Sequence, residues 1–136
     1  MSALEKHDIP LDKDLIQYWQ RETGFEHAPR SVLASNSSPT AFFTQHLAIT
    51  TELLRHLNKE SISIPEDVSI IGFDDIPMAE FFKVPITVVK QEPYSIGKEA
   101  TKLLLENIND KHKHAQKIMI ACSITERQSC KKYLLG

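Results

Sequence analysis

The chain has 136 residues, which suits one ordinary domain or a part of a larger protein, and its hydrophobic fraction of 41% is normal for a globular fold. The formal net charge of −2 gives no basic footprint for nucleic acid. We find no signal-peptide pattern, no apolar stretch long enough to span a membrane and no disulfide framework around the two cysteines, so we expect a cytoplasmic protein.

The first third of the chain predicts short helices and one strand. Leu4–Tyr18 is expected to be a short helix or an irregular segment. Thr23 and Glu26 have the spacing of a capping box, which predicts that a helix starts there. Pro29 within that helix predicts either a kink or a helix that restarts at the proline. After a polar loop, the apolar run Thr40–Thr44 predicts a buried strand.

The middle of the chain predicts a helix followed by the central strand of a sheet. Apolar residues recur with helical spacing at Leu47, Leu53, Leu54 and Leu57. A turn at Pro65 then leads into Val68–Phe73, a short run rich in β-branched residues. Such a run is typical of a strand buried on both faces. Strand, helix and strand together predict a right-handed βαβ unit.

Two carboxylates, Asp74 and Asp75, end the central strand abruptly. Ligands bind outside the carboxyl ends of strands in open parallel sheets, so this acidic pair is a candidate ligand site. The alternative is that the two residues only end a strand and begin a turn. Adjacent residues on a strand point to opposite faces, which is poor geometry for two carboxylates that share one reaction centre.

Catalysis and metal binding have little support. The sequence has no P-loop, no dinucleotide-binding glycine motif, no zinc spacing and no nucleophile elbow, so we expect neither an enzyme nor a cofactor. His112 and His114 invite a metal interpretation, but no third ligand is near them in the sequence. A solvated turn is the better interpretation of these two histidines, and we predict no metal site.

The last third of the chain predicts a loop, two or three strands and one long helix. Ile76–Lys83 is expected to be a loop or a short helix, in which Phe81 and Phe82 either stack on a ligand or fix the segment to the protein. Ile86–Val89 predicts a strand, and Pro93 suits the first position of an amphipathic helix. A strand is expected at Gln116–Ala121, and a last short strand or a turn at Ile124–Arg127.

Three blocks of this sequence resemble the LacI/GalR family of transcriptional regulators. The first runs from Ile64 to Pro77 and contains the central strand with its two acids. The second begins at Pro85 and includes Gln91, Pro93, Ile96, Gly97, Ala100 and Leu104; the third comprises Ile124, Glu126, Arg127 and Ser129. The blocks occur in the family's order, and the resemblance extends from about Ile9 to Ser129.

The resemblance implies an α/β fold, with a parallel sheet flanked by helices, that is an incomplete version of the two-lobed, type I periplasmic-binding-protein-like core. Residues 1–85 would form the effector-binding C-terminal lobe, residues 86–115 an excursion into the N-terminal lobe, and residues 116–136 the return and the tail. The helix-turn-helix and most of the N-terminal lobe are expected to be absent. Ile86–Val89 would therefore lack its partner strands.

The function implied is sensing of a small-molecule effector, typically a sugar, that binds between the lobes. Binding would change the grip of a homodimer on operator DNA, through an N-terminal domain missing here. Asp74 would accept hydrogen bonds from effector hydroxyls, and Phe73 would pack behind it. The alternative is a sugar-binding transport receptor with the same lobes.

Gln45 and His46 depart from the family pattern. They stand near the place of an Asn-Asp or Ser-Asp pair that helps to line the effector cleft. Replacing that carboxylate by an amide and an imidazole implies either a changed effector preference or a damaged cleft. For His46 the alternative is a surface residue at the start of the following helix.

Overall fold

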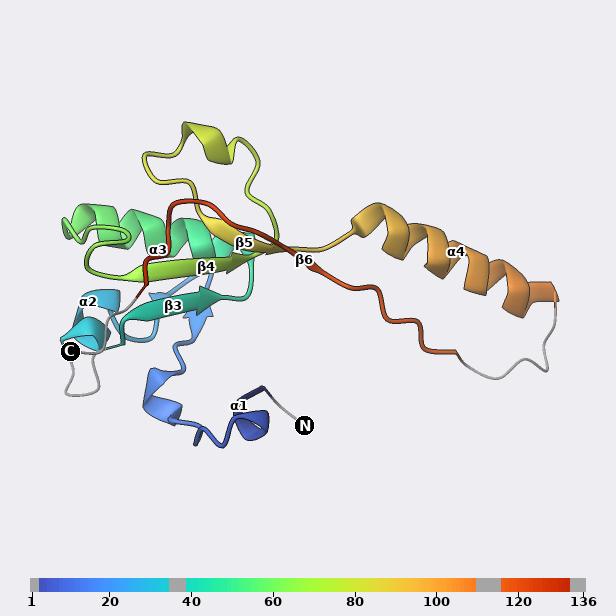
Figure 1. The fold of residues 1–136 in the computed structure, drawn as a ribbon, viewed down its shortest axis with the longest axis horizontal. Helices are drawn as coiled ribbons and strands as arrows, with labels where there is room; N and C mark the ends of the chain where they lie inside the picture. Colours follow the sequence, from blue (N-terminus) through green and yellow to red (C-terminus); the bar gives the residue numbers. More distant parts are fainter. Residues whose placement is uncertain (1–2, 35–38, 110–115, 133–136) are drawn as a thin grey trace.

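The computed structural model describes residues 3–34, 39–109 and 116–132 of the chain. Its centre is a four-stranded sheet with the strand order β3-β4-β5-β6 (Figure 1). These strands are β3 (Ala41–Thr44), β4 (Ser69–Phe73), β5 (Thr87–Lys90) and β6 (Ser123–Thr125). β3, β4 and β5 are parallel, and β6 runs antiparallel to β5. The α/β fold class with a mostly parallel sheet is confirmed.

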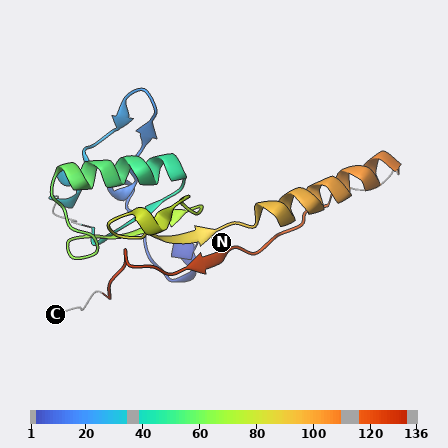
Figure 2. The ribbon, with the colours of Figure 1, turned by 90° about the horizontal axis from the view of Figure 1, so that it is seen from above.

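One long helix, α3 (Leu47–Lys59), covers one face of the sheet (Figure 2). Leu53 and Leu57 from this helix are buried against Ile70 of β4 and Val88 of β5, in the hydrophobic core. Burying each such side chain contributes roughly 1.5–3 kcal/mol. The helical spacing predicted from the sequence is therefore confirmed, and it supplies the core of the protein.

Gly72 allows α3 to lie close to the sheet. A Cβ atom added at Gly72 would lie 3.3 Å from Oγ1 of Thr50 and 3.4 Å from Cγ1 of Val88. Thr50 also contacts β3: the buried hydroxyls of Thr44 and Thr50 are 2.7 Å apart, so a hydrogen bond joins β3 to α3. The small residue in β4 and the two threonines together set the distance between helix and sheet.

The second face of the sheet is only partly covered by the described residues. Along β4, Ile70 and Gly72 are buried, whereas Ile71 and Phe73 on the opposite face are half-buried. Phe43 of the edge strand β3 is 59% exposed. The prediction of a central strand buried on both faces, and of a buried strand at residues 40–44, is wrong for this reason: α3 covers one face only.

The N-terminal region contains α1 (Ala3–Lys6), a 3-10 turn η1 (Lys13–Leu15), a two-stranded hairpin of β1 (Trp19–Gln20) and β2 (Gly24–Phe25), and α2 (Pro29–Leu33). The predicted capping box is wrong. Gly24 adopts a φ of +80°, and the Thr23 hydroxyl donates to Oε1 of Gln20, so this segment forms the hairpin turn. The prediction that a helix begins at Pro29 is confirmed.

β5 lies inside the sheet, between β4 and β6. The expectation that Ile86–Val89 lacks partner strands is therefore wrong: β5 pairs in register with both neighbours. The helix α4 (Pro93–Asn109) then projects away from the sheet, as Figure 1 shows, and has no buried residue. The division into lobes at residues 85 and 115 remains a prediction.

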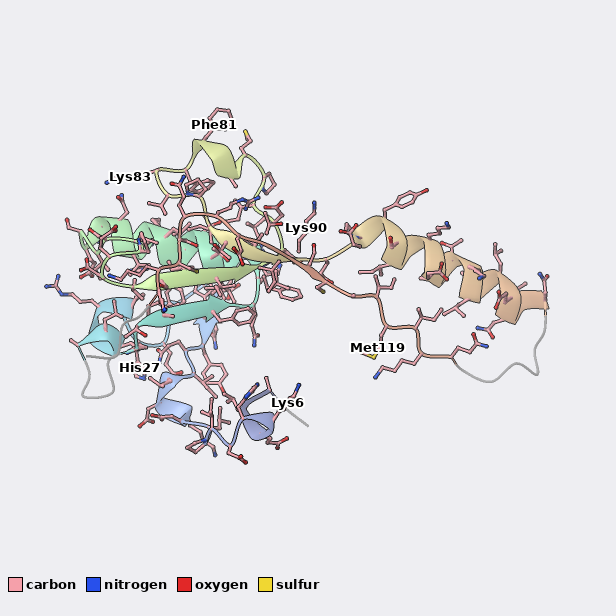
Figure 3. The ribbon with its side chains drawn as sticks, viewed as in Figure 1. Lys6, His27, Phe81, Lys83, Lys90 and Met119 are labelled. Atoms are coloured by element: carbon pink, nitrogen blue, oxygen red, sulfur yellow. The ribbon has the colours of Figure 1, made fainter. Side chains whose placement is uncertain are left out.

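The chain returns to the sheet through residues 116–122, which lie beside α4 in both ribbon views. They form no strand, so the prediction for Gln116–Ala121 is wrong; the described part of the chain places no partner strand next to them. Met119 on this segment is 84% exposed (Figure 3). At Ile124–Arg127, where a last short strand or a turn was predicted, the structure has the strand β6, which ends at Thr125. Within the described ranges, no helix is long and apolar enough to cross a bilayer.

Candidate functional site

Asp74 lies at the carboxyl edge of the sheet, directly after β4. Its backbone is left-handed, with a φ of +71°, and its N–H donates to the carbonyl of Val89 at 2.9 Å. Its side-chain Oδ1 accepts a hydrogen bond of 2.6 Å from Nε2 of Gln91, the residue that follows β5. The half-buried carboxylate is therefore held at the point where two parallel strands end, where ligands bind in such sheets.

Asp75 has a different partner. Its Oδ1 accepts a hydrogen bond of 2.8 Å from Nη2 of Arg127 and another of 2.9 Å from the N–H of Ile76. Simple strand alternation does not separate the two acids, because Asp74 is not extended. They are separated by their partners instead, Gln91 for the first and Arg127 for the second. Which acid faces a ligand remains a prediction.

Phe73 is the last residue of β4 and is half-buried, on the face of the sheet opposite to Ile70 and Gly72. Its backbone pairs with Val89, so it lies beside the same strand end as Asp74. The predicted packing of Phe73 behind the carboxylate remains a prediction.

Gln45 and His46 follow β3 at the same edge of the sheet, and both are exposed. His46 is the N-cap of α3: its Nδ1 accepts a hydrogen bond of 3.1 Å from the N–H of Ala48. This contact gives His46 the local role that was the alternative interpretation of the sequence. A role for either residue in ligand binding remains a prediction.

The loop after the acidic pair contains a 3-10 turn, η2 (Ala79–Phe81), and divides its two aromatic residues between different roles. Phe82 is partly buried against the core, so it fixes the loop to the protein. Phe81 is 79% exposed and points away from the sheet at the top of Figure 3. Fixing of the loop is thus confirmed for Phe82, whereas stacking of the exposed Phe81 on a ligand remains a prediction.

Two cavities lie away from the acidic pair. One, of about 700 Å³, lies between α3 and the loop before β5, with Arg55, Phe82 and Lys83 among its lining residues. The other, of about 250 Å³, lies between the N-terminal hairpin and β3. Asp74, Phe73, Gln45 and His46 line neither cavity. These cavities therefore give no support to the predicted ligand site, which is an edge of the sheet.

Another charged pair of the described residues lies on α3. Arg55 donates to both carboxylate oxygens of Glu52, at 2.6 and 3.0 Å, and this bond holds the pKa of Glu52 below its ordinary value. In the part of the chain that the structure describes, no three His, Cys, Asp or Glu side chains gather as a metal site. His112 and His114 lie outside the described residues.

Sequence reasoning gave no role to two residues of the site, Gln91 and Arg127. Gln91 could have been found, because it follows β5 as Asp74 follows β4 and parallel neighbours end at the same edge. Arg127 lies 52 residues after Asp75, and no local pattern connects the two.

Comparisons with known proteins agree with this architecture. A family model described as a periplasmic binding protein-like domain matches residues 2–130. The HTH-type transcriptional repressor PurR of Vibrio cholerae serotype O1 (strain M66-2) is 36% identical over 134 residues, which cover 95% of this chain and 39% of the repressor. The chain therefore spans well under half of the length of that relative.

Two solved structures have a similar fold. A LacI family transcriptional regulator from Enterococcus faecium with bound ribose is 30% identical, with a TM-score of 0.71, over 94% of this chain and 48% of the other. A complex of the transcriptional regulator CelR with cellobiose is 26% identical, with a TM-score of 0.77, over 93% of this chain and 39% of the other. The periplasmic-binding-protein-like fold expected from the sequence is thus confirmed.

Proposed function

Because this chain belongs to the family of periplasmic-binding-protein-like domains, with the LacI/GalR type of effector-binding core, we propose that it senses a sugar-like small molecule for a transcriptional regulator. The observation that carries the proposal is the Asp74 carboxylate at the shared end of β4 and β5. The similar regulators with bound ribose and cellobiose support a sugar as the class of effector.

The proposed chemistry uses Asp74 as an acceptor. An ionised carboxylate accepts two hydrogen bonds from vicinal hydroxyls, and each such charge-assisted bond contributes roughly 1.5–3 kcal/mol. One oxygen already accepts from Gln91, so a sugar hydroxyl would either replace that amide or bind the second oxygen. Phe73, Gln45 and His46 would line the same edge of the sheet.

The proposed output is a change in DNA binding. Effector binding would bias the relative orientation of two lobes, and so the grip of a homodimer on operator DNA through an N-terminal domain, in the cytoplasm. The second candidate is a transport receptor with the same lobes. The regulators described above favour the first. The reading frame upstream of Met1 discriminates between them, since one predicts a helix-turn-helix and the other a signal peptide.

Calorimetric titration with ribose and cellobiose tests the role of Asp74. In the full-length protein, Asp74→Ala should weaken the binding of the cognate sugar by one to several orders of magnitude, at about 1.4 kcal/mol per decade. Glu22→Gln, at an exposed position in the hairpin turn, is the matched control and should bind normally.

Asp75→Ala is the informative comparison in the same titration. It should act mainly on the turn and on thermal stability, because Asp75 is bound to Arg127. If Asp75→Ala abolishes binding with an unchanged melting temperature while Asp74→Ala binds normally, the assignment of the two acids is reversed. If neither sugar binds the full-length protein, these sugars are not its effectors.

A further inference from the structure

We propose that Arg127 is a positioning residue for the candidate site: it holds Asp75, and through Asp75 it fixes the left-handed turn that aims the Asp74 carboxylate. The effect on ligand binding rests on the function proposed above. The effect on the turn does not, since it concerns the conformation of the protein alone.

The guanidinium of Arg127 is bound from two sides. Nη2 donates to Oδ1 of Asp75 at 2.8 Å, and Nη1 donates to the carbonyl of Ile86 at 2.9 Å. The backbone N–H of Arg127 also donates to Oγ1 of Thr87, at 3.0 Å. Two donors of Arg127, Nη1 and the backbone N–H, therefore bind the start of β5. The third, Nη2, binds the turn after β4.

The ion pair is well placed to have an effect on structure. The side chain of Arg127 is 21% exposed and that of Asp75 is 34% exposed, so the pair is better shielded from water than an ordinary surface salt bridge. A planar guanidinium can hold the Ile86 carbonyl and the Asp75 carboxylate at once, which a lysine ammonium matches poorly. The geometry therefore calls for arginine rather than for a positive charge alone.

The turn needs such an anchor. A non-glycine residue with a φ of +71°, as at Asp74, is disfavoured and persists only when its surroundings fix it. On one side, the N–H of Asp74 is bound to Val89. On the other side, Asp75 is bound to Arg127 and to the N–H of Ile76. Releasing Asp75 removes one of these two restraints, so the direction of the Asp74 carboxylate is then fixed less firmly, by the bonds to Val89 and Gln91 alone.

Amide hydrogen exchange of the full chain tests the proposal without a ligand. In Arg127→Gln, exchange at the amides of Asp74 and Ile76 should accelerate by roughly tenfold or more. Exchange at Thr50 in α3 and at Ser69 in β4 should change by less than about twofold, since their amides bond elsewhere. Unchanged exchange at Asp74 and Ile76, or equal acceleration at all four amides, would overturn the proposal.

Two further variants establish the route. Asp75→Ala should reproduce the acceleration at the Asp74 amide, and the double variant should add little to either single one, because both act through one contact. Arg127→Lys should show only part of the amide protection that Arg127→Gln loses, because lysine keeps the positive charge but not the planar set of N–H donors. Independent, additive effects of the two substitutions would show that Arg127 does not act through Asp75.

Titration of the same variants with ribose and cellobiose tests the consequence for binding. If one sugar binds the unmutated chain, Arg127→Gln should weaken it about tenfold while Thr50 stays protected. Unchanged affinity would refute a role of Arg127 in the site. If neither sugar binds the full-length protein, neither is its effector, and the exchange measurement still decides whether Arg127 positions the turn.

Discussion

Replacing the Ser129 hydroxyl is the sharpest test of how the sheet is held together. Ser129 is fully buried, its Oγ accepts a hydrogen bond of 2.7 Å from the N–H of Thr87, and it donates one of 2.6 Å to the carbonyl of Ile70. One side chain thus connects the beginnings of β4 and β5. In Ser129→Ala the Ile70 carbonyl keeps the Cys130 thiol at 3.2 Å, but the Thr87 amide loses the acceptor that the hydroxyl provides.

An unpaired buried amide costs about 1–3 kcal/mol, and the lost bond to Ile70 adds about 1 kcal/mol or less, so we expect a loss of about 1–4 kcal/mol. An unfolding entropy of about 2.1 cal/mol/K per residue over 136 residues converts this to a fall in melting temperature of roughly 4–14 °C. Ser123→Ala, exposed in β6, is the control and should stay within about 0.5 kcal/mol.

Urea denaturation followed by circular dichroism, together with thermal melts, measures both variants. The denaturant slope should stay unchanged, so that the shift in midpoint reports stability alone. If Ser129→Ala melts within about 1 °C of the unmutated chain while the control behaves as expected, the hydroxyl is not what holds the two strands.

Three other substitutions test the packing, the helix cap and the surface charges. Gly72→Ala should destabilise the fold by about 1–2 kcal/mol in urea titrations, because its Cβ would lie 3.3 Å from Oγ1 of Thr50; the cost should fall in a Thr50→Ala background, and an equal cost there would argue against this clash. His46→Asp should raise the free energy of unfolding by about 0.5–1 kcal/mol, because aspartate is a strong N-cap at the positive end of a helix, and His46→Ala should not raise it. Equal melting temperatures of these two variants would contradict the role of residue 46 as a cap. Arg55 holds the pKa of Glu52 below its ordinary 4.5, so the stabilisation by this pair should be present above that pH and lost as the pH falls through the lowered pKa. The difference in melting temperature between the unmutated chain and Glu52→Gln should therefore close in acid. A difference that stays constant with pH would refute the pairing.

The elements predicted correctly are those whose signal is local. α3 follows from the spacing of its leucines, β4 from a run of β-branched residues, and the start of α2 from Pro29. The capping box failed because its hydroxyl had a nearer partner in Gln20 and its glycine adopted a hairpin conformation. A local motif predicts a structure only when no other local arrangement uses the same groups.

Burial at the edges of the sheet could not be predicted from composition. The apolar residues of β3 suggested a buried strand. Phe43 is nevertheless exposed, because β3 is an edge strand and α3 covers only the other face of the sheet. The predicted strand at residues 116–121 failed similarly, since an alternating pattern forms a strand only beside a partner.

The candidate site also combines residues that the local sequence could identify with contacts that it could not. Asp74 and Asp75 were predicted together because they end a recognisable strand, which is a property of neighbouring residues; the choice of Asp74 came from the family resemblance and remains a prediction. The left-handed backbone of Asp74 and its bond to Gln91 depend on the pairing of β4 with β5, and the bond of Asp75 to Arg127 joins residues far apart in the chain. The position of the first acid was therefore predictable, whereas the groups that orient it were not.

The pairing of Lys90 with Ser123 has a consequence for engineering this fold. The chain leaves the sheet at the end of β5 and re-enters it at the start of β6, at positions that face each other. Residues 91–122 are therefore a cassette inserted between the two strands of a β-hairpin. A two-residue Asn-Gly turn has the right geometry to close that hairpin, so the cassette could be excised or exchanged without moving the ends it joins.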